Sequence, residues 1–324
     1  MSPSLTYLER EAGKLGFQIS PLEKVVRLGE LAGDISRHPF LGRVLLLKGG
    51  TALNLGFGVP SRLSVDLDFN YVGQIDRARM LEERPQVEDA IQQLATRHNY
   101  QVQRSADAFA GQKFYLSYLS ALGGRERIEI DLNFLFRIPI GKPERREIWQ
   151  PGELDRPMVG MVSLSELILG KLLALLDRGA VRDAWDVGRL PAFAGDELRS
   201  NDFRARFIAL SAILKHGLPN YTYERFEQQV TDRAIREALA PMLARDVAPP
   251  PDVLAKRAWD VVRPLLDLNE NEIRYFEEIA RGELRLDYIF PDDPAEINLL
   301  ASHPAIQRKL TNVRKGLPIQ KSHS

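Results

Sequence analysis

Residues 63–72 alternate between apolar and polar side chains up to Asn70. Val65, Leu67 and Phe69 occupy one set of alternating positions, and the other set holds Ser64, Asp66, Asp68 and Asn70. A period of two residues is typical of a β-strand, whose successive side chains point to opposite faces of the sheet. The pattern therefore predicts a strand with one buried face and one face that carries two carboxylates.

A second alternating segment, residues 126–136, predicts another strand. Its apolar positions hold Ile128, Ile130, Leu132 and Phe134, while Asp131 lies among its polar positions. Two short apolar segments, 43–47 and 113–119, predict further strands. The first half of the chain therefore has at least three strands in our interpretation.

The remaining periodic segments have helical spacing. Residues 3–37 and 77–98 fit helices, the second with a break near Pro85. Residues 163–179 fit a helix that starts with a capping box of Ser163 and Glu166 and stops at Gly179. From there to about residue 286 the pattern indicates helices only, with a rigid joint at 248–252.

The change from strand-like segments in the first half of the chain to helical segments in the second half predicts the fold class and the domains. We expect an α/β (α+β) domain with a small mixed sheet over residues 1–160, followed by a helical domain over residues 161–324. A chain of 324 residues is long enough for about two domains.

Composition narrows the class of protein. The chain has 44 basic and 44 acidic residues, so its net charge gives no argument for bulk attraction to nucleic acid. It has no cysteine, which excludes disulfides and thiolate zinc sites, and its five histidines lack metal-ligand spacing. No apolar run approaches a membrane span, and the N-terminus lacks a signal-peptide core, so we expect a cytoplasmic protein without membrane contact.

Asp66 and Asp68 are the first candidates for chemistry. Two carboxylates on one strand face repel each other and favour a cation, and Mg²⁺ prefers such oxygen ligands. If the strand of Asp131 lies alongside, three acids converge and suit two divalent ions. A solvated strand face is the alternative reading of the Asp-x-Asp pattern by itself.

Gly49, Gly50 and Thr51 follow a predicted strand and precede a predicted helix. Glycine lets backbone N–H groups approach a phosphate, and the N-terminus of a helix favours an anion. A bare Gly-Gly is also what a plain turn contains. The order of strand, Gly-Gly, helix and Asp-x-Asp strand favours the phosphate site.

Lys171 lies in the predicted helix 163–179, near its apolar side. Asp183 and Asp186 follow in the next helix, at a spacing that places them on neighbouring faces. The lysine could meet a phosphate, or the three residues could form a structural ion pair. The residues alone leave these two readings open.

Together these pieces resemble a known family. The segments "LKGGTALNLGFG…SRLSVDLDF" and "GKLLALLDRGAVRDAWDV" are similar to the AbiEii/AbiGii-type abortive-infection nucleotidyltransferases, members of the DNA polymerase β-like superfamily, many of which are toxins of toxin–antitoxin pairs. The match covers residues 45–72 and 163–190. Gly-Gly-Thr stands here where the superfamily commonly has Gly-Ser.

The resemblance implies a polymerase β-like domain over residues 1–160 and a reaction that transfers NMP from an NTP to an acceptor hydroxyl with release of pyrophosphate. It assigns the metal, Mg²⁺ or Mn²⁺, to Asp66 and Asp68, with Asp131 added from the strand alternation. The nucleotide is expected to contact Gly49, Gly50, Thr51, Ser64 and Lys171. The catalytic set is expected to be Asp66, Asp68, Lys171 and Asp186, with Asp183 as a rival for the last position.

The resemblance also implies partners. The expected acceptor is the 3′ end of a tRNA, and a cognate antitoxin protein is expected to bind the toxin. Basic clusters at 142–147 and 307–321 could contact RNA, although a solvated tail would read in the same way.

Two other classes of function stay open. A nucleotidyltransferase that modifies a small molecule or a protein would use the same acids without a basic surface. A non-catalytic binding protein could keep the fold, but the intact set of Asp66, Asp68, Lys171 and Asp186 argues against it.

Overall fold

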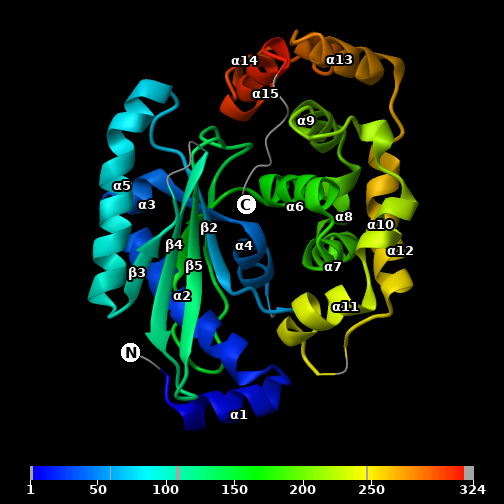
Figure 1. Cartoon of the computed structure of the whole chain (residues 1–324). Helices are drawn as coiled ribbons and strands as arrows, with labels where there is room; N and C mark the ends of the chain where they lie inside the picture. The colour runs from blue at the N-terminus through cyan, green and yellow to red at the C-terminus, as the bar shows by residue number, and fades with distance from the viewer. Residues whose placement is uncertain (1–2, 59, 107–109, 246, 317–324) are drawn as a thin grey trace. The chain divides into compact units, whose positions relative to one another are not determined.

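A seven-stranded mixed sheet organises the first part of the chain (Figure 1). The computed structural model describes residues 3–58, 60–106, 110–245 and 247–316. The strands follow the order β3-β4-β5-β2-β1-β7-β6, in which β2 runs parallel to β5 and β1 parallel to β7. Their bounds are β1 Leu45–Lys48, β2 Asp66–Tyr71, β3 Gln101–Arg104, β4 Gly111–Leu119, β5 Arg125–Asn133, β6 Glu144–Glu147 and β7 Met158–Met161.

Two long helices, α2 (Ile19–Arg37) and α5 (Arg77–Arg97), pack against one face of this sheet. The side chains below them are fully buried, among them Leu67, Phe69 and Ile130. Because side chains alternate along a strand, the intervening residues form a polar face on the other side of the sheet. The same unit contains α1 (Leu5–Leu15), α3 (Leu41–Val44) and α4 (Gly49–Gly56).

The chain divides into two compact units. The first contains the described residues up to Leu167 together with Leu239–Ala248, and the second contains Ile168–Ala238 and the described chain from Pro249 onwards. Strand pairing of Arg62 with Leu243 ties the segment 239–248 to the first unit.

Helices make up the second unit. In its core α7 packs against α12, and Phe226 of α10 contacts the Trp259 ring edge-on at 5.3 Å between ring centres. The longer helices are α6 Leu164–Arg178 (whose first turn belongs to the first unit), α7 Val181–Arg189, α8 Pro191–Arg199, α9 Asn201–Ser211, α10 Tyr223–Gln229, α12 Pro251–Val262, α13 Glu270–Ala280, α14 Pro294–Ala301 and α15 Pro304–Arg314. Its single turns are η1 Leu218–Asn220, α11 Asp232–Ala234, η2 Ile235–Leu239, η4 Arg263–Leu265 and η5 Leu286–Tyr288, whereas η3 Ala240–Met242 belongs to the first unit.

The mixed α/β fold class, the four predicted strands and the helical second half are confirmed. The predicted break near Pro85 is wrong, since α5 continues through it. The ring removes one backbone hydrogen bond, to the carbonyl of Leu81, and Leu81 lies on the exposed side of the helix, where water can replace the lost donor. Within the described residues, no helix is long and apolar enough to cross a bilayer. Residues 317–321 of the predicted basic arm lie outside the described chain.

Candidate active site

A row of four charged residues crosses the polar face of the sheet. Asp68 on β2 is the register neighbour of Lys48 on β1 and of Asp131 on β5, and Asp131 is in turn opposite Lys113 on β4. Residues directly opposite each other share a face of the sheet. The fold therefore places two carboxylates side by side between two lysines, and we call Lys48, Asp68, Asp131 and Lys113 the charged row.

The charges of the row act on one another. Lys113 Nζ lies 3.2 Å from Asp131 Oδ2, and this carboxylate raises the pKa of Lys113 although burial alone would lower it. Burial also raises the pKa of Asp131, and the Asp68 carboxylate adds to the rise while Lys48 and Lys113 oppose it. Two acids that repel at partly buried positions are stabilised by a cation beside them.

The oxygen donors at this place fit a divalent ion. Asp66 and Asp68 project from alternate positions of β2, on the same face as Asp131. Across the described part of the chain, no three His, Cys, Asp or Glu side chains already form a ready metal-ligand set. Asp131 is paired with Lys113 in this structure. A pair of carboxylates, with water and substrate phosphates completing the shell, is the arrangement that Mg²⁺ commonly accepts.

Gly49 opens α4 directly beside this row. Its φ is +71°, and a Cβ there would lie 2.3 Å from Asp68 Oδ2, so the backbone approaches the carboxylate as only glycine allows. The sequence placed Gly49 and Gly50 before a helix, whereas they form its first turn. The first N–H groups of a helix have no partner within it and suit an anion.

Thr51 and Ser64 are less available than the sequence suggested. Thr51 is fully buried, and its hydroxyl donates a hydrogen bond to the backbone carbonyl of Asp66. Ser64 is also buried. The hydrogen bond of Thr51 therefore holds α4 against the start of β2 and so positions Asp66.

Replacing Gly49 by alanine is expected to destabilise the fold and to move Asp68. Alanine at positive φ costs about 1–2 kcal/mol, and the contact with Asp68 adds a further roughly 1–3 kcal/mol. Gly123→Ala is the matched control, because Gly123 also has a positive φ but open space at its Cβ position. Urea unfolding of both variants measures the difference, and equal losses would contradict the proposed contact between Gly49 and Asp68.

Glu166 connects β2 to the start of α6. Its carboxylate accepts hydrogen bonds from Asn70 Nδ2 at 2.9 Å and from the Ile140 N–H at 2.7 Å. As predicted, Ser163 caps the helix, because its hydroxyl oxygen accepts a hydrogen bond from the Glu166 N–H. The Glu166 side chain does not complete a capping box, because Asn70 and Ile140 donate hydrogen bonds to it instead. Burial raises the pKa of Glu166 to about 7.

Glu166→Gln is expected to remove a pH dependence of stability. A carboxyl whose pKa rises on folding from 4.5 to about 7 contributes stability that is complete below about pH 4.5 and lost as the pH rises through about 7. The wild type should therefore lose about 3 kcal/mol relative to the glutamine variant over this range. Urea unfolding at pH 5 and pH 8 tests this, and parallel pH profiles would contradict it.

Lys171 forms a buried ion cluster within the second unit. Its ammonium lies 3.1 Å from Asp183 Oδ1 and 2.8 Å from Asp186 Oδ2, and all three side chains are buried. Arg178 Nε adds a contact of 2.7 Å to Asp183. Burial would raise the pKa of Asp183, but Lys171 and Arg178 together hold it below its usual value.

The structure thus groups the candidate residues in two sets. Gly49, Gly50, Thr51, Ser64, Asp66, Asp68 and Asp131 gather in the first unit, and Lys171, Asp183 and Asp186 gather in the second. Sequence reasoning missed Lys48 and Lys113. Lys48 directly precedes the Gly-Gly pair, and this position could have identified it as a candidate site residue. The pairing of Lys113 with Asp131 depends on the register between two strands, which the sequence does not give.

Comparisons with known proteins give a matching family and a similar fold. A family model described as nucleotidyl transferase AbiEii toxin, type IV toxin–antitoxin system, matches residues 34–264. Among solved structures, the fold is similar to MenT4, the nucleotidyltransferase toxin Rv2826c from Mycobacterium tuberculosis H37Rv, with a TM-score of 0.56 and 16% identity over 93% of this chain and 98% of that one. A search of curated proteins finds no match.

Proposed function

The chain belongs to the AbiEii family of nucleotidyltransferase toxins of type IV toxin–antitoxin systems, and from this premise we propose that it transfers NMP from an NTP to the 3′ end of a tRNA. The observation that carries the proposal is the charged row beside Gly49, where two neighbouring carboxylates meet the first turn of a helix. Carboxylates for a cation and helix N–H groups for phosphate are what this reaction needs at one place.

In the proposed site Asp66 and Asp68, with Asp131, would hold Mg²⁺ or Mn²⁺. The bound ion would neutralise charge that develops on the reacting phosphate. The Asp131 carboxylate, which neighbours Asp68 across the two strands, would take the proton of the attacking hydroxyl. The N–H groups at Gly49 and Gly50 would bind triphosphate oxygens, while Thr51, through its hydrogen bond to Asp66, supports this segment from within the core.

For Lys171 we propose the role that family resemblance gives it, which is to neutralise phosphate charge. Asp186 and Asp183 would then orient its ammonium, since the lysine contacts both. A compact ammonium is suited to a single phosphate oxygen. An antitoxin partner follows from membership of the type IV family. The cytoplasmic location stays a prediction from the sequence.

A labelling experiment tests the proposed reaction. The purified chain is incubated with each of the four α-³²P-labelled NTPs, Mg²⁺ and total RNA, and the products are separated on a denaturing gel. We expect one nucleotide to label bands of tRNA size in a metal-dependent reaction. Label in a protein or a small molecule would identify another acceptor, and absence of label with every NTP and acceptor would contradict nucleotide transfer.

A further inference from the structure

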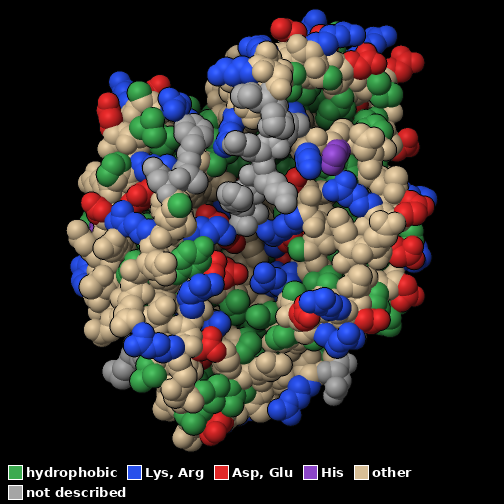
Figure 2. All heavy atoms as spheres, in the orientation of Figure 1, with side chains coloured by type: hydrophobic (Ala, Val, Ile, Leu, Met, Phe, Trp, Pro, Cys, Tyr) green, Lys and Arg blue, Asp and Glu red, His purple; other side chains and the backbone are tan. Residues whose placement is uncertain are grey.

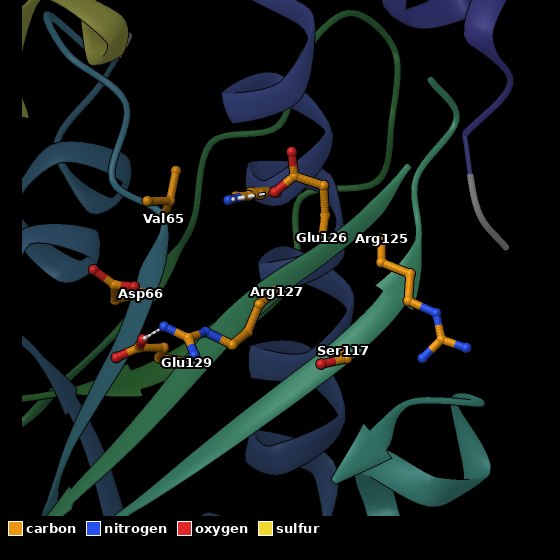
Figure 3. Close-up of a pocket in the computed structure, with 8 residues that line it drawn as sticks. Val65, Asp66, Ser117, Arg125, Glu126, Arg127 and Glu129 are labelled. Carbon is orange, nitrogen blue, oxygen red and sulfur yellow. Dashed lines mark hydrogen bonds and ion pairs between the residues drawn. The ribbon is translucent and has the colours of Figure 1, made fainter. Parts of the chain in front are cut away.

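A groove of about 440 Å³ opens beside Asp66, where strand β5 runs on past the start of β2 (Figure 3). The first β2 residue in the sheet, Asp66, is paired with Glu129, whereas residues 125–128 of β5 pair with β4. The groove therefore lies along the open edge of β5, where Arg127 and Glu129 line it from the polar face and Lys24 of α2 lines it from the other side, and it ends at the proposed metal ligand Asp66.

Next to this groove, the Arg127 guanidinium lies over the ring of Tyr115. The guanidinium carbon of Arg127 lies 4.6 Å from the centre of the Tyr115 ring, and Arg127 also pairs with Glu129 at 3.0 Å. The Arg127 side chain is 56% exposed, so the outer side of the pair is accessible. We call Tyr115, Ser117 and Arg127, which lie on the same polar face, the β4–β5 platform.

We propose that the groove and the β4–β5 platform bind the terminal nucleotides of a single-stranded RNA acceptor, an inference that rests on the proposed nucleotide transfer. Aromatic rings and guanidinium planes on a sheet face are the groups on which splayed bases stack. A groove of a few hundred cubic ångströms is of the size that holds one small ligand.

The order of the strands favours the acceptor over the NTP at this place. Gly49, the proposed phosphate site, follows β1, whereas the platform lies on β5 and β4, and β2 with its two aspartates runs between them. In phosphoryl transfer the attacking and leaving oxygens lie roughly in line, on opposite sides of the reacting phosphorus. The two substrates are therefore expected on opposite sides of Asp66 and Asp68.

The charges of the groove indicate how the acceptor is held. Lys24, Arg125 and Arg127 are balanced by Asp66, Glu126 and Glu129, and acidic and basic side chains intermingle over β4 and β5 (Figure 2). A balanced surface releases few counterions on binding RNA. Stacking and hydrogen bonds, rather than bulk charge, should dominate, and the affinity should depend weakly on salt.

Fluorescence anisotropy with a fluorescein-labelled single-stranded RNA 12-mer, measured on the full chain without NTP, tests the proposal. Tyr115→Ala is expected to weaken binding by roughly tenfold, because one stacked base contributes about 5- to 150-fold in affinity. Tyr115→Phe keeps the ring and should bind within about twofold of the wild type. Arg127→Ala, which leaves the ring in place, should lose roughly threefold. In transfer assays Tyr115→Ala should raise the KM for RNA and leave the KM for NTP unchanged.

The chain offers a matched control in Tyr288, whose ring lies 4.7 Å from the Arg285 guanidinium carbon in a similar stack. Tyr288→Ala should not change RNA binding. Equal RNA affinity of the wild type and Tyr115→Ala would overturn the proposal, as would transfer to a protein or small molecule by an enzyme that does not bind the 12-mer. If the wild type transfers nothing to any acceptor, the proposed function fails, while the anisotropy result still decides whether the platform binds RNA.

Discussion

Asp68→Asn is expected to reduce nucleotide transfer by roughly a thousandfold. A divalent ion at the reacting phosphate contributes several kcal/mol to the barrier reduction, and each 1.4 kcal/mol is a factor of ten in rate. Asparagine keeps the shape of the side chain and removes its charge. Because Asp68 raises the pKa of the neighbouring Asp131, its loss also relieves a repulsion, so the free energy of unfolding should change by less than about 1 kcal/mol.

Asp66→Asn should behave in the same way as Asp68→Asn. Asp155→Asn is the matched control, since Asp155 is an exposed aspartate of the same unit. Label incorporation measured against Mg²⁺ concentration, with urea unfolding of each variant, separates lost chemistry from lost folding. Wild-type transfer rates in either Asp66→Asn or Asp68→Asn would refute the metal-ligand assignment.

Lys171→Met is expected to lower the stability of the protein by about 3–5 kcal/mol as well as to reduce transfer. Removing one partner of a buried ion pair leaves an uncompensated charge, and here two buried carboxylates lose the same ammonium. The sequence alone suggested a loss of NTP binding, but the burial of the cluster means that the fold itself depends on this lysine. Urea unfolding of the variant measures the effect.

Arg178→Ala is a suitable control for Lys171, because Arg178 contacts Asp183 with a side chain that is 44% exposed. Its loss should cost no more than about 1 kcal/mol. The double variant Lys171→Met/Asp186→Asn should recover part of the stability without recovering transfer. A double variant as active as the wild type would show that Lys171 is structural only. Lys171→Arg should restore only part of the transfer, since a forked guanidinium does not replace an ammonium.

Local patterns were enough to predict the elements that carry the acids. The alternation around Asp66 and Asp68, and around Asp131, identified β2 and β5 because each has one buried face. The strands β3, β6 and β7 were missed, since each has only four residues and lacks the uninterrupted run of large apolar residues that identified the equally short β1.

The pairing of strands that are distant in the sequence could not be predicted from such local patterns. The register that sets Asp131 beside Asp68, and Lys113 beside Asp131, depends on the parallel partner of β2 and not on any local spacing. The hydrogen bonds of Glu166 with Asn70 and Ile140 join positions far apart in sequence, so the capping-box pattern was matched without its usual geometry.

The two faces of the sheet also differ in how well they tolerate substitutions. Every second residue of β4 and β5 is packed under α2 and α5, and a substitution there creates a cavity in the core. The intervening residues, such as Tyr115 and Arg127, can be exchanged at little cost in folding. With the acceptor on the proposed platform, a lineage of such toxins could acquire a new acceptor by substitutions at Tyr115, Ser117 or Arg127, while Asp66, Asp68, Asp131 and the buried side of the sheet stay as they are.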